Sequence, residues 1–244
     1  MKKHGITGPI FISEGDVYKQ TNYKMHDYGA LGIAENGDLY RYAKLAADVS
    51  AGYLLVSKGR EANHQNVALS ANAAVGDTKV IPTVGATAVD ANEYDEGWLV
   101  FSDVSPEGEA YKIVSHEANA GSLATDIYLD RPLLAAATTS SEVTLVRNPW
   151  NEPAVSQLIA ERAAGVTLTD WDVSVANYGW LKTRGVHPVL IDTTGITVGL
   201  IACISDQVDG AVGLKSDMDA EVPVGQAMQT GTAGEFNPVY LEID

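Results

Sequence analysis

Short apolar runs separated by Gly, Pro, Asn and Asp recur along the chain and restrict its fold more than any other feature. A tight Asn36-Gly37 pair between two such runs is a strong signal for a two-residue hairpin turn, because both central residues of that turn need a positive φ. Many short strands with frequent turns predict an all-β fold, a barrel or sandwich of mostly antiparallel strands. The expected strands cover residues 39–43, 52–57, 79–81, 97–101, 110–114, 125–129, 142–146, 179–183, 187–191, 198–204, 225–228 and 239–243.

Helical signals are few. Residues 155–164 contain good helix formers and are followed by Gly165, but a strand fits so short a segment nearly as well. No long amphipathic helix and no heptad repeat is present, so we expect little helix.

The distribution of Pro, Gly and polar residues predicts three parts. Residues 1–25 carry scattered Gly, Pro, Lys and Asn and form an expected extended N-terminal arm. Two prolines bracket a polar turn at residues 147–153, which is typical of a boundary between modules. We therefore expect one β-rich module at residues 26–150 and a second at residues 151–244, either separate or packed with the first as one unit.

The charge of the chain bears on its partners. The 32 acidic and 16 basic side chains give a formal net charge of -16, which repels phosphate backbones and argues against nucleic acid as a partner. The acidity serves solubility or faces a basic partner surface, and the sequence does not separate the two. No apolar run approaches the ~20 residues that span a bilayer, and the start of the chain lacks a signal-peptide pattern, so we expect a product of the cytoplasm with no membrane partner.

Cys203 is the only cysteine, so no disulfide can form within one chain. It lies in an apolar run, and a buried thiol is the expected state there rather than a nucleophile. No two of the five histidines are spaced for a metal on one helix face. The acidic stretch with Asp217, Asp219 and Glu221 fails the EF-hand pattern, because Val222 stands where the loop needs glycine.

An acidic pair and the known catalytic motifs bear on enzyme activity. Asp170 and Asp172 flank Trp171 and would share one face of a strand, as in a fragment of a carbohydrate site, although an exposed acidic edge is the better interpretation. No phosphate-binding loop, dinucleotide fingerprint or nucleophile elbow occurs. We therefore predict no enzyme activity, no catalytic residue, no metal and no cofactor.

Several phrases of Gly and aromatic residues follow one another in a characteristic order. The first is residues 28–44, in which a Leu-Gly phrase leads through a polar turn into an aromatic-rich strand. The others are residues 51–54, 93–100, 108–113, 178–185, 209–213, 224–228 and 233–241. In this order they resemble the head decoration (capsid cement) proteins of tailed bacteriophages and related virion structural proteins, from about residue 26 to the end.

The resemblance implies a β-rich protein on the outside of a phage capsid that bridges subunits of the major capsid protein, often as a homotrimer. Attachment at several points of a symmetric lattice makes overall binding strong even when each contact is weak. The arm is a natural lattice contact, with Ile10, Phe11 and Ile12 after Pro9 as its anchors. A frayed or locally packed terminus is an equal alternative.

A second hypothesis is a virion-carried protein that binds a host surface or a carbohydrate through exposed tryptophans. Trp98 and Trp180 lie within apolar strands and are expected in the core, which leaves Trp150 and Trp171 as stacking platforms. An enzyme built on Asp170 and Asp172 is the third and weakest hypothesis.

Overall fold

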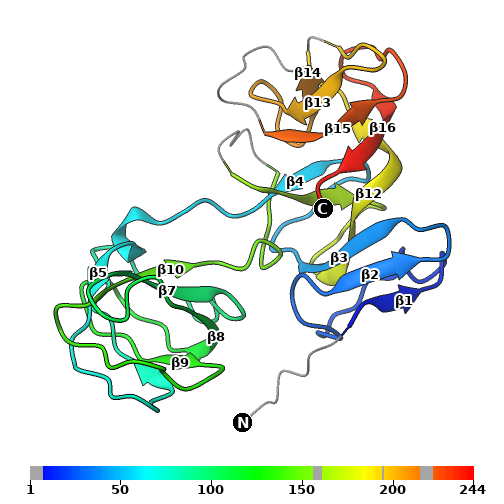
Figure 1. The fold of residues 1–244 in the computed structure, drawn as a ribbon. Coiled ribbons are helices and arrows are strands. Elements are labelled where there is room, and N and C mark those ends of the chain that lie inside the picture. Colours follow the sequence, from blue (N-terminus) through cyan, green and yellow to red (C-terminus); the bar gives the residue numbers. More distant parts are fainter. Residues whose placement is uncertain (1–7, 156–160, 194, 215–221) are drawn as a thin grey trace. The chain divides into compact units, whose positions relative to one another are not determined.

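The computed structural model describes residues 8–155, 161–193, 195–214 and 222–244, and they form two compact units (Figure 1). One unit is the continuous segment Arg60–Asn148, here called the inserted unit. The other, the split unit, comprises the described residues up to Gly59 together with Pro149–Asp244. The division differs from the expected modules at residues 26–150 and 151–244. The chain does cross between units at the turn of residues 147–153, but residues 26–59 belong with the C-terminal part because their strands pair with strands formed after residue 160.

The all-β prediction is confirmed. The described residues form strands β1 to β16 and one short 3-10 helix, η1 (Ala62–His64). Every ladder between these strands is antiparallel except that of β1 with β2. The ambiguous segment at residues 155–164 ends in a strand, because Ala163 and Ala164 begin β11, while residues 156–160 lie outside the described part.

The inserted unit is a six-stranded sheet in the order β5-β10-β7-β8-β9-β6. Its strands are β5 (Val67–Ala68), β6 (Lys79–Val80), β7 (Trp98–Asp103), β8 (Ala110–His116), β9 (Ile127–Leu129) and β10 (Glu142–Val146). A bridge between Leu69 and Pro82 and a hydrogen bond from Thr83 N to Ala68 O join the two ends of the sheet. The closed sheet surrounds one core, which includes Leu99, Phe101, Tyr111 and Ile113.

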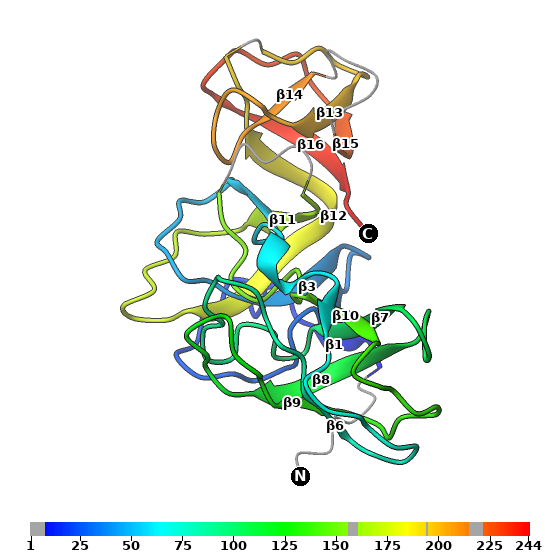
Figure 2. The ribbon, with the colours of Figure 1, turned by 90° about the vertical axis from the view of Figure 1, so that its left-hand side faces the viewer.

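The split unit is a ten-stranded sheet whose main path runs β1-β2-β3-β12-β16-β15-β13-β14, with β11 pairing both β12 and β4. Its strands are β1 (Ile10–Ile12), β2 (Leu31–Ala34), β3 (Leu39–Lys44), β4 (Leu54–Val56), β11 (Ala163–Thr167), β12 (Tyr178–Leu190), β13 (Ile201–Ile204), β14 (Val212–Leu214), β15 (Pro223–Ala227) and β16 (Phe236–Glu242). The long strand β12 pairs with β3 along its first half and with β16 along its second half (Figure 2).

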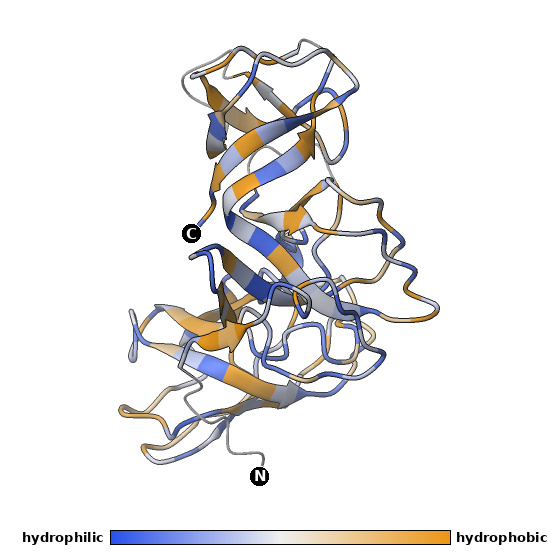
Figure 3. Ribbon diagram, turned by 90° about the vertical axis from the view of Figure 1, so that its right-hand side faces the viewer, coloured by the Kyte–Doolittle hydropathy of each residue, from blue (hydrophilic) through white to orange (hydrophobic). Residues whose placement is uncertain are grey.

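The first half of β12 is buried on both faces of the sheet. Leu181 packs on one side with Ala43, Trp150 and Trp171, whereas Trp180 packs on the other side with a different cluster. By contrast β16 alternates buried and exposed residues, and hydrophobic and hydrophilic segments alternate along such ribbons in Figure 3. The split unit therefore holds several separate apolar clusters.

Candidate binding surface

The predicted lattice contacts lie together at one edge of the ten-stranded sheet. Strand β1 pairs in parallel with β2, so that Ile10 lies opposite Gly32 and Ile12 opposite Ala34. Successive strand residues face opposite ways. Ile12 accordingly points into the protein and is 7% exposed, whereas Phe11 is 85% exposed, Pro9 is exposed and Ile10 is partly buried. The described part of the arm is thus locally packed, and it presents one large apolar side chain to solvent.

A pocket of about 370 Å³ lies beside β1, and we call it the β1 pocket. Strand β1 forms one side and residues from Asp16 to Met25 form another, with His26, Tyr42 and Trp180 completing the lining. Tyr42 on β3 and Trp180 on β12 are directly opposite in the register of the two strands, and their ring centroids are 5.2 Å apart in an edge-to-face arrangement. Pairing of two strands that are far apart in sequence therefore builds the aromatic part of the pocket.

Glycine at position 32 allows this arrangement. A Cβ atom at Gly32 would lie 2.2 Å from Cδ1 of Ile12 and 2.9 Å from Cζ3 of Trp180. Both distances are too short for real contacts, so any side chain at position 32 would displace the Ile12 side chain and the Trp180 ring. The absent side chain lets both pack closely over β2.

His26 packs against both aromatic rings. Its ring centroid lies 5.1 Å from that of Tyr42 and 5.4 Å from that of Trp180. Burial lowers the pKa of His26 below its usual value, and the negative charge of Asp27 opposes this only in part. The imidazole is therefore neutral near pH 7, with one nitrogen that can donate a hydrogen bond and one that can accept one.

The two charged residues of the lining, Asp16 and Lys19, are paired with each other. Lys19 Nζ lies 2.5 Å from Asp16 Oδ1 in an exposed ion pair, and the Lys19 and Ser13 hydrogen bonds hold the pKa of Asp16 below its usual value. Such an exposed pair contributes little to stability, because solvent screens it. It does keep the Asp16 carboxylate ionised beside the pocket.

The predicted roles of the four tryptophans are largely reversed. Trp150 is 7% exposed, and its Nε1 donates to Ala164 O over 2.9 Å, while Trp171 is 3% exposed. Neither can serve as a stacking platform, so that expectation was wrong. Trp98 is instead 37% exposed, because strand alternation in β7 turns Leu99 and Phe101 inward. Trp180 is buried, as expected, although its ring also lines the β1 pocket.

Asp170 and Asp172 each accept a backbone hydrogen bond. Asp170 Oδ1 accepts a hydrogen bond from Ala51 N over 2.8 Å, and Asp172 Oδ1 accepts from Ser174 N and Oγ. The bonds from Ser174 hold the pKa of Asp172 below its usual value. Asp172 therefore stabilises a local turn, as Asx residues commonly do. Asp170 instead joins two segments that are far apart in sequence.

Three other histidines have hydrogen-bond partners within the fold. His64 is fully buried between the Tyr94 hydroxyl and Thr87 O, and His116 Nε2 accepts from Tyr94 N. His187 Nε2 lies 3.2 Å from Thr167 O, and burial lowers the pKa of His187. These contacts engage all three histidines within the fold.

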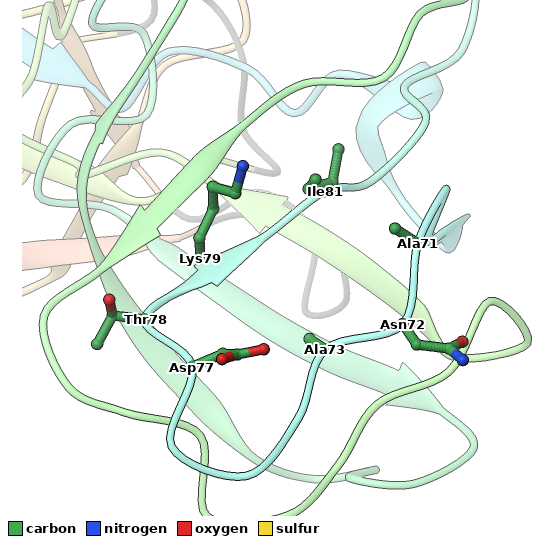
Figure 4. A pocket seen from close by; sticks show the side chains of 7 residues that line it. All are labelled: Ala71, Asn72, Ala73, Asp77, Thr78, Lys79 and Ile81. Atoms are coloured by element: carbon green, nitrogen blue, oxygen red, sulfur yellow. The ribbon is translucent and has the colours of Figure 1, made fainter.

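The inserted unit has a pocket of about 280 Å³, shown in Figure 4. Three of its polar lining residues already form hydrogen bonds or an ion pair within the protein. Asp77 Oδ2 accepts from Ala74 N, Asn72 Oδ1 accepts from Thr139 N, and Lys79 Nζ lies 3.0 Å from Asp126 Oδ2. The pocket therefore offers few polar groups to a ligand.

Within the described ranges, no group of three or more His, Cys, Asp or Glu residues is arranged to hold a metal ion. The stretch with Asp217, Asp219 and Glu221 lies outside those ranges. Cys203 is buried, as expected. No helix in the described part of the chain is long and apolar enough to cross a membrane.

Comparison with known proteins adds no relative: no family model, no curated protein and no solved structure matches this chain. The β1 pocket was not anticipated from the sequence. Tyr40 and Tyr42 alternate in the expected strand at residues 39–43, which hinted at an aromatic face, but their proximity to residue 180 depends on strand pairing.

Proposed function

We propose that this chain is a virion structural protein that decorates the outside of a phage capsid and stabilises it by bridging major capsid subunits. The observation that carries the proposal is the ordered set of Gly-aromatic phrases from residue 28 onward, which resembles head decoration proteins. The fold is compatible with that role. The phrase at residues 28–44 lies on β2 and β3, and the phrase at residues 178–185 lies on β12, which pairs with β3.

The exposed apolar arm supports the same proposal. A side chain as exposed as Phe11 loses contact with water when a partner covers it, and burial of a phenylalanine contributes about 1.5–3 kcal/mol. A symmetric lattice presents many copies of one partner site, so a modest contact of this size gains from repetition. The acidic surface keeps the free protein soluble before it attaches.

Co-sedimentation with expanded, undecorated phage heads tests the proposal. We expect the purified protein to sediment with the heads at saturating stoichiometry, and failure to bind any head lattice would refute the proposed function. Light scattering after size exclusion tests the accompanying proposal that the free protein is a homotrimer.

Carbohydrate or host-surface binding is the second candidate, and Trp98 is the observation that favours it. Trp98 on β7 lies between Val146 on β10 and Lys112 on β8 in the register of the sheet, and it is partly exposed. An exposed aromatic ring beside polar side chains can stack on a sugar. Glycan-array binding that is lost in Trp98→Ala would favour this candidate over capsid decoration.

A further inference from the structure

The β1 pocket has the size and lining of a receptor for one large side chain. Its volume of about 370 Å³ is near the lower end of the ~300–1,000 Å³ typical of small-molecule sites. Tyr42 and Trp180 supply aromatic surface, and aromatic pairs gain ~0.5–1.5 kcal/mol beyond the burial of area. These walls favour an aromatic ring over an aliphatic chain or a polar cofactor.

His26 supplies the polar element of the pocket. Both of its ring nitrogens lack a hydrogen-bond partner within the described part of the chain, although the ring is half-buried against Tyr42 and Trp180. A half-buried imidazole without partners gains when a ligand provides one. An indole N–H or a phenol O–H could donate to it, which again favours an aromatic ring with a polar atom.

The rim of the pocket has the character of a protein-binding surface. Phe11, Tyr23 and Met25 line the pocket and are all more than half exposed. Clustered exposed apolar side chains around a concave site mark interaction surfaces, and residues that exclude water surround the anchor side chain of an interface. A free small molecule would leave this rim in water, whereas a partner protein would cover it.

The charge near β1 indicates which partner residue should lie next to the aromatic side chain in the pocket. Strands β1 and β2 are parallel, so the residues after them emerge at the same end, and these include Glu14 and Glu35. Both are exposed and neither has an ion-pair partner within the described ranges. Two unpaired carboxylates at one end of the strand pair complement a lysine or arginine of a partner.

We propose that the β1 pocket receives one tryptophan or tyrosine side chain of a partner protein, with an adjacent lysine or arginine of that partner placed toward Glu14 and Glu35. The inference deepens the proposed function and rests on it in one respect, since a capsid subunit would then be the partner. The ring lies against Tyr42 and Trp180, its polar hydrogen is donated to His26, and the rim around Phe11 excludes water.

The test uses the full-length protein labelled with ¹⁵N and the blocked tripeptide acetyl-Arg-Trp-Arg-amide as probe. We expect its titration to shift the indole N–H signal of Trp180 with a Kd of about 1 mM or tighter. The control peptides acetyl-Arg-Ala-Arg-amide and acetyl-Glu-Trp-Glu-amide should bind at least ~10-fold and several-fold more weakly, respectively. The first control removes the anchor ring, and the second reverses the charge.

Variants that leave the core intact locate the site. His26→Ala should weaken binding of the probe about two- to tenfold, the loss of one hydrogen bond, and Phe11→Glu should weaken it further. Val175→Glu is the matched control, because Val175 is also highly exposed in the split unit but does not line the pocket, and it should bind like the wild type.

The inference is overturned if the Trp180 signal does not move with the probe up to about 10 mM, tenfold above the expected constant. Equal binding of the alanine peptide, or unchanged binding in both His26→Ala and Phe11→Glu, overturns it as well. So does a simple sugar that shifts the same signals more strongly than the probe, since the pocket would then be a glycan site.

Head binding separates this inference from the proposed function. A protein that binds the probe but not phage heads retains the pocket inference and loses the capsid role. A protein that binds heads but not the probe retains the capsid role and loses the inference. When both bind, Phe11→Glu should reduce co-sedimentation and Val175→Glu should not.

Discussion

The inserted unit and the split unit bury their short strands in different ways. The inserted unit closes six strands around one core, so that alternate residues face solvent. The split unit covers both faces of its central strands and so divides its apolar residues among several clusters. The two units therefore differ in the number of their cores, whereas both bury polar side chains, such as His64 in the inserted unit and Lys182 in the split unit.

The largest expected loss of stability comes from a substitution in the core of the inserted unit. Phe101→Ala should lower the free energy of unfolding by about 3–5 kcal/mol, because a fully buried aromatic ring leaves a cavity. Its neighbour Val100 faces partly outward, and Val100→Ala should cost less than about 1 kcal/mol. Urea denaturation followed by circular dichroism measures both, and similar costs for the two variants would contradict a single central core.

The next effect concerns the polar pair inside the split unit. Lys182 is buried on β12, where its Nζ lies 2.5 Å from Asp38 Oδ2 and 2.8 Å from Val186 O. Lys182→Met should cost about 3 kcal/mol, since it leaves a partly buried carboxylate without its partner.

The double variant Lys182→Met with Asp38→Leu is the control. It should recover much of the loss, because apolar side chains often replace a buried ion pair without cost. Denaturant midpoints of the two variants measure the difference. A double variant no more stable than Lys182→Met would show that the pair contributes more than charge compensation.

A smaller effect tests the close packing over β2. Gly32→Val should cost about 1–3 kcal/mol and displace β1, because the new side chain would overlap Ile12 and the Trp180 ring. Gly15→Ala is a suitable control, since no atom lies within 4 Å of a Cβ placed at Gly15. Chemical denaturation and hydrogen exchange of the β1 amides follow the two variants. Unchanged β1 protection in Gly32→Val would mean that β1 does not need this contact.

The smallest effect is a pH dependence in the split unit. Burial lowers the pKa of His187 in the folded protein below its usual value of 6.5. The folded state then binds protons less readily than the unfolded state, so the His187 contribution to stability is present above about pH 6.5 and is lost as the pH falls below it. His187→Gln should therefore lose less stability than the wild type between about pH 7.5 and about pH 5.5. Equal losses, measured by urea denaturation, would contradict this.

Several parts of the fold were predictable because they depend on local chemistry. Short runs of β-branched and aromatic residues between turn formers predicted the strands, and a hairpin does join β2 and β3 at Asn36-Gly37. The expected two-residue turn was wrong, because only Gly37 has a positive φ and three residues separate the hydrogen-bonded Ala34 and Asp38. The break at residues 147–153 coincides with a crossing between units. The two units have other bounds than the expected modules because residues 26–59 join strands more than a hundred positions away.

The tryptophans show most clearly that burial cannot be predicted from local sequence. Trp98 lies in an apolar run, which suggested a core residue, but its strand has only one buried face. Trp150 and Trp171 lie among polar residues, which suggested exposure, yet one cluster that also contains Leu181 buries both. Local hydrophobicity does not report which face of a sheet is covered, because the cover comes from elsewhere in the chain.

The sequence by itself determined the class of fold, the strand-and-turn rhythm, the absence of any disulfide within the chain and the acidic charge, since each depends on composition or on neighbours along the chain. Only the tertiary structure decided the two units, the faces that are buried and the β1 pocket. The pocket exists because β1, β2, β3 and β12 follow one another in the sheet and Gly32 lets Trp180 pack over β2. Long-range strand pairing has no local signature, since backbone hydrogen bonds are the same whichever strands they join.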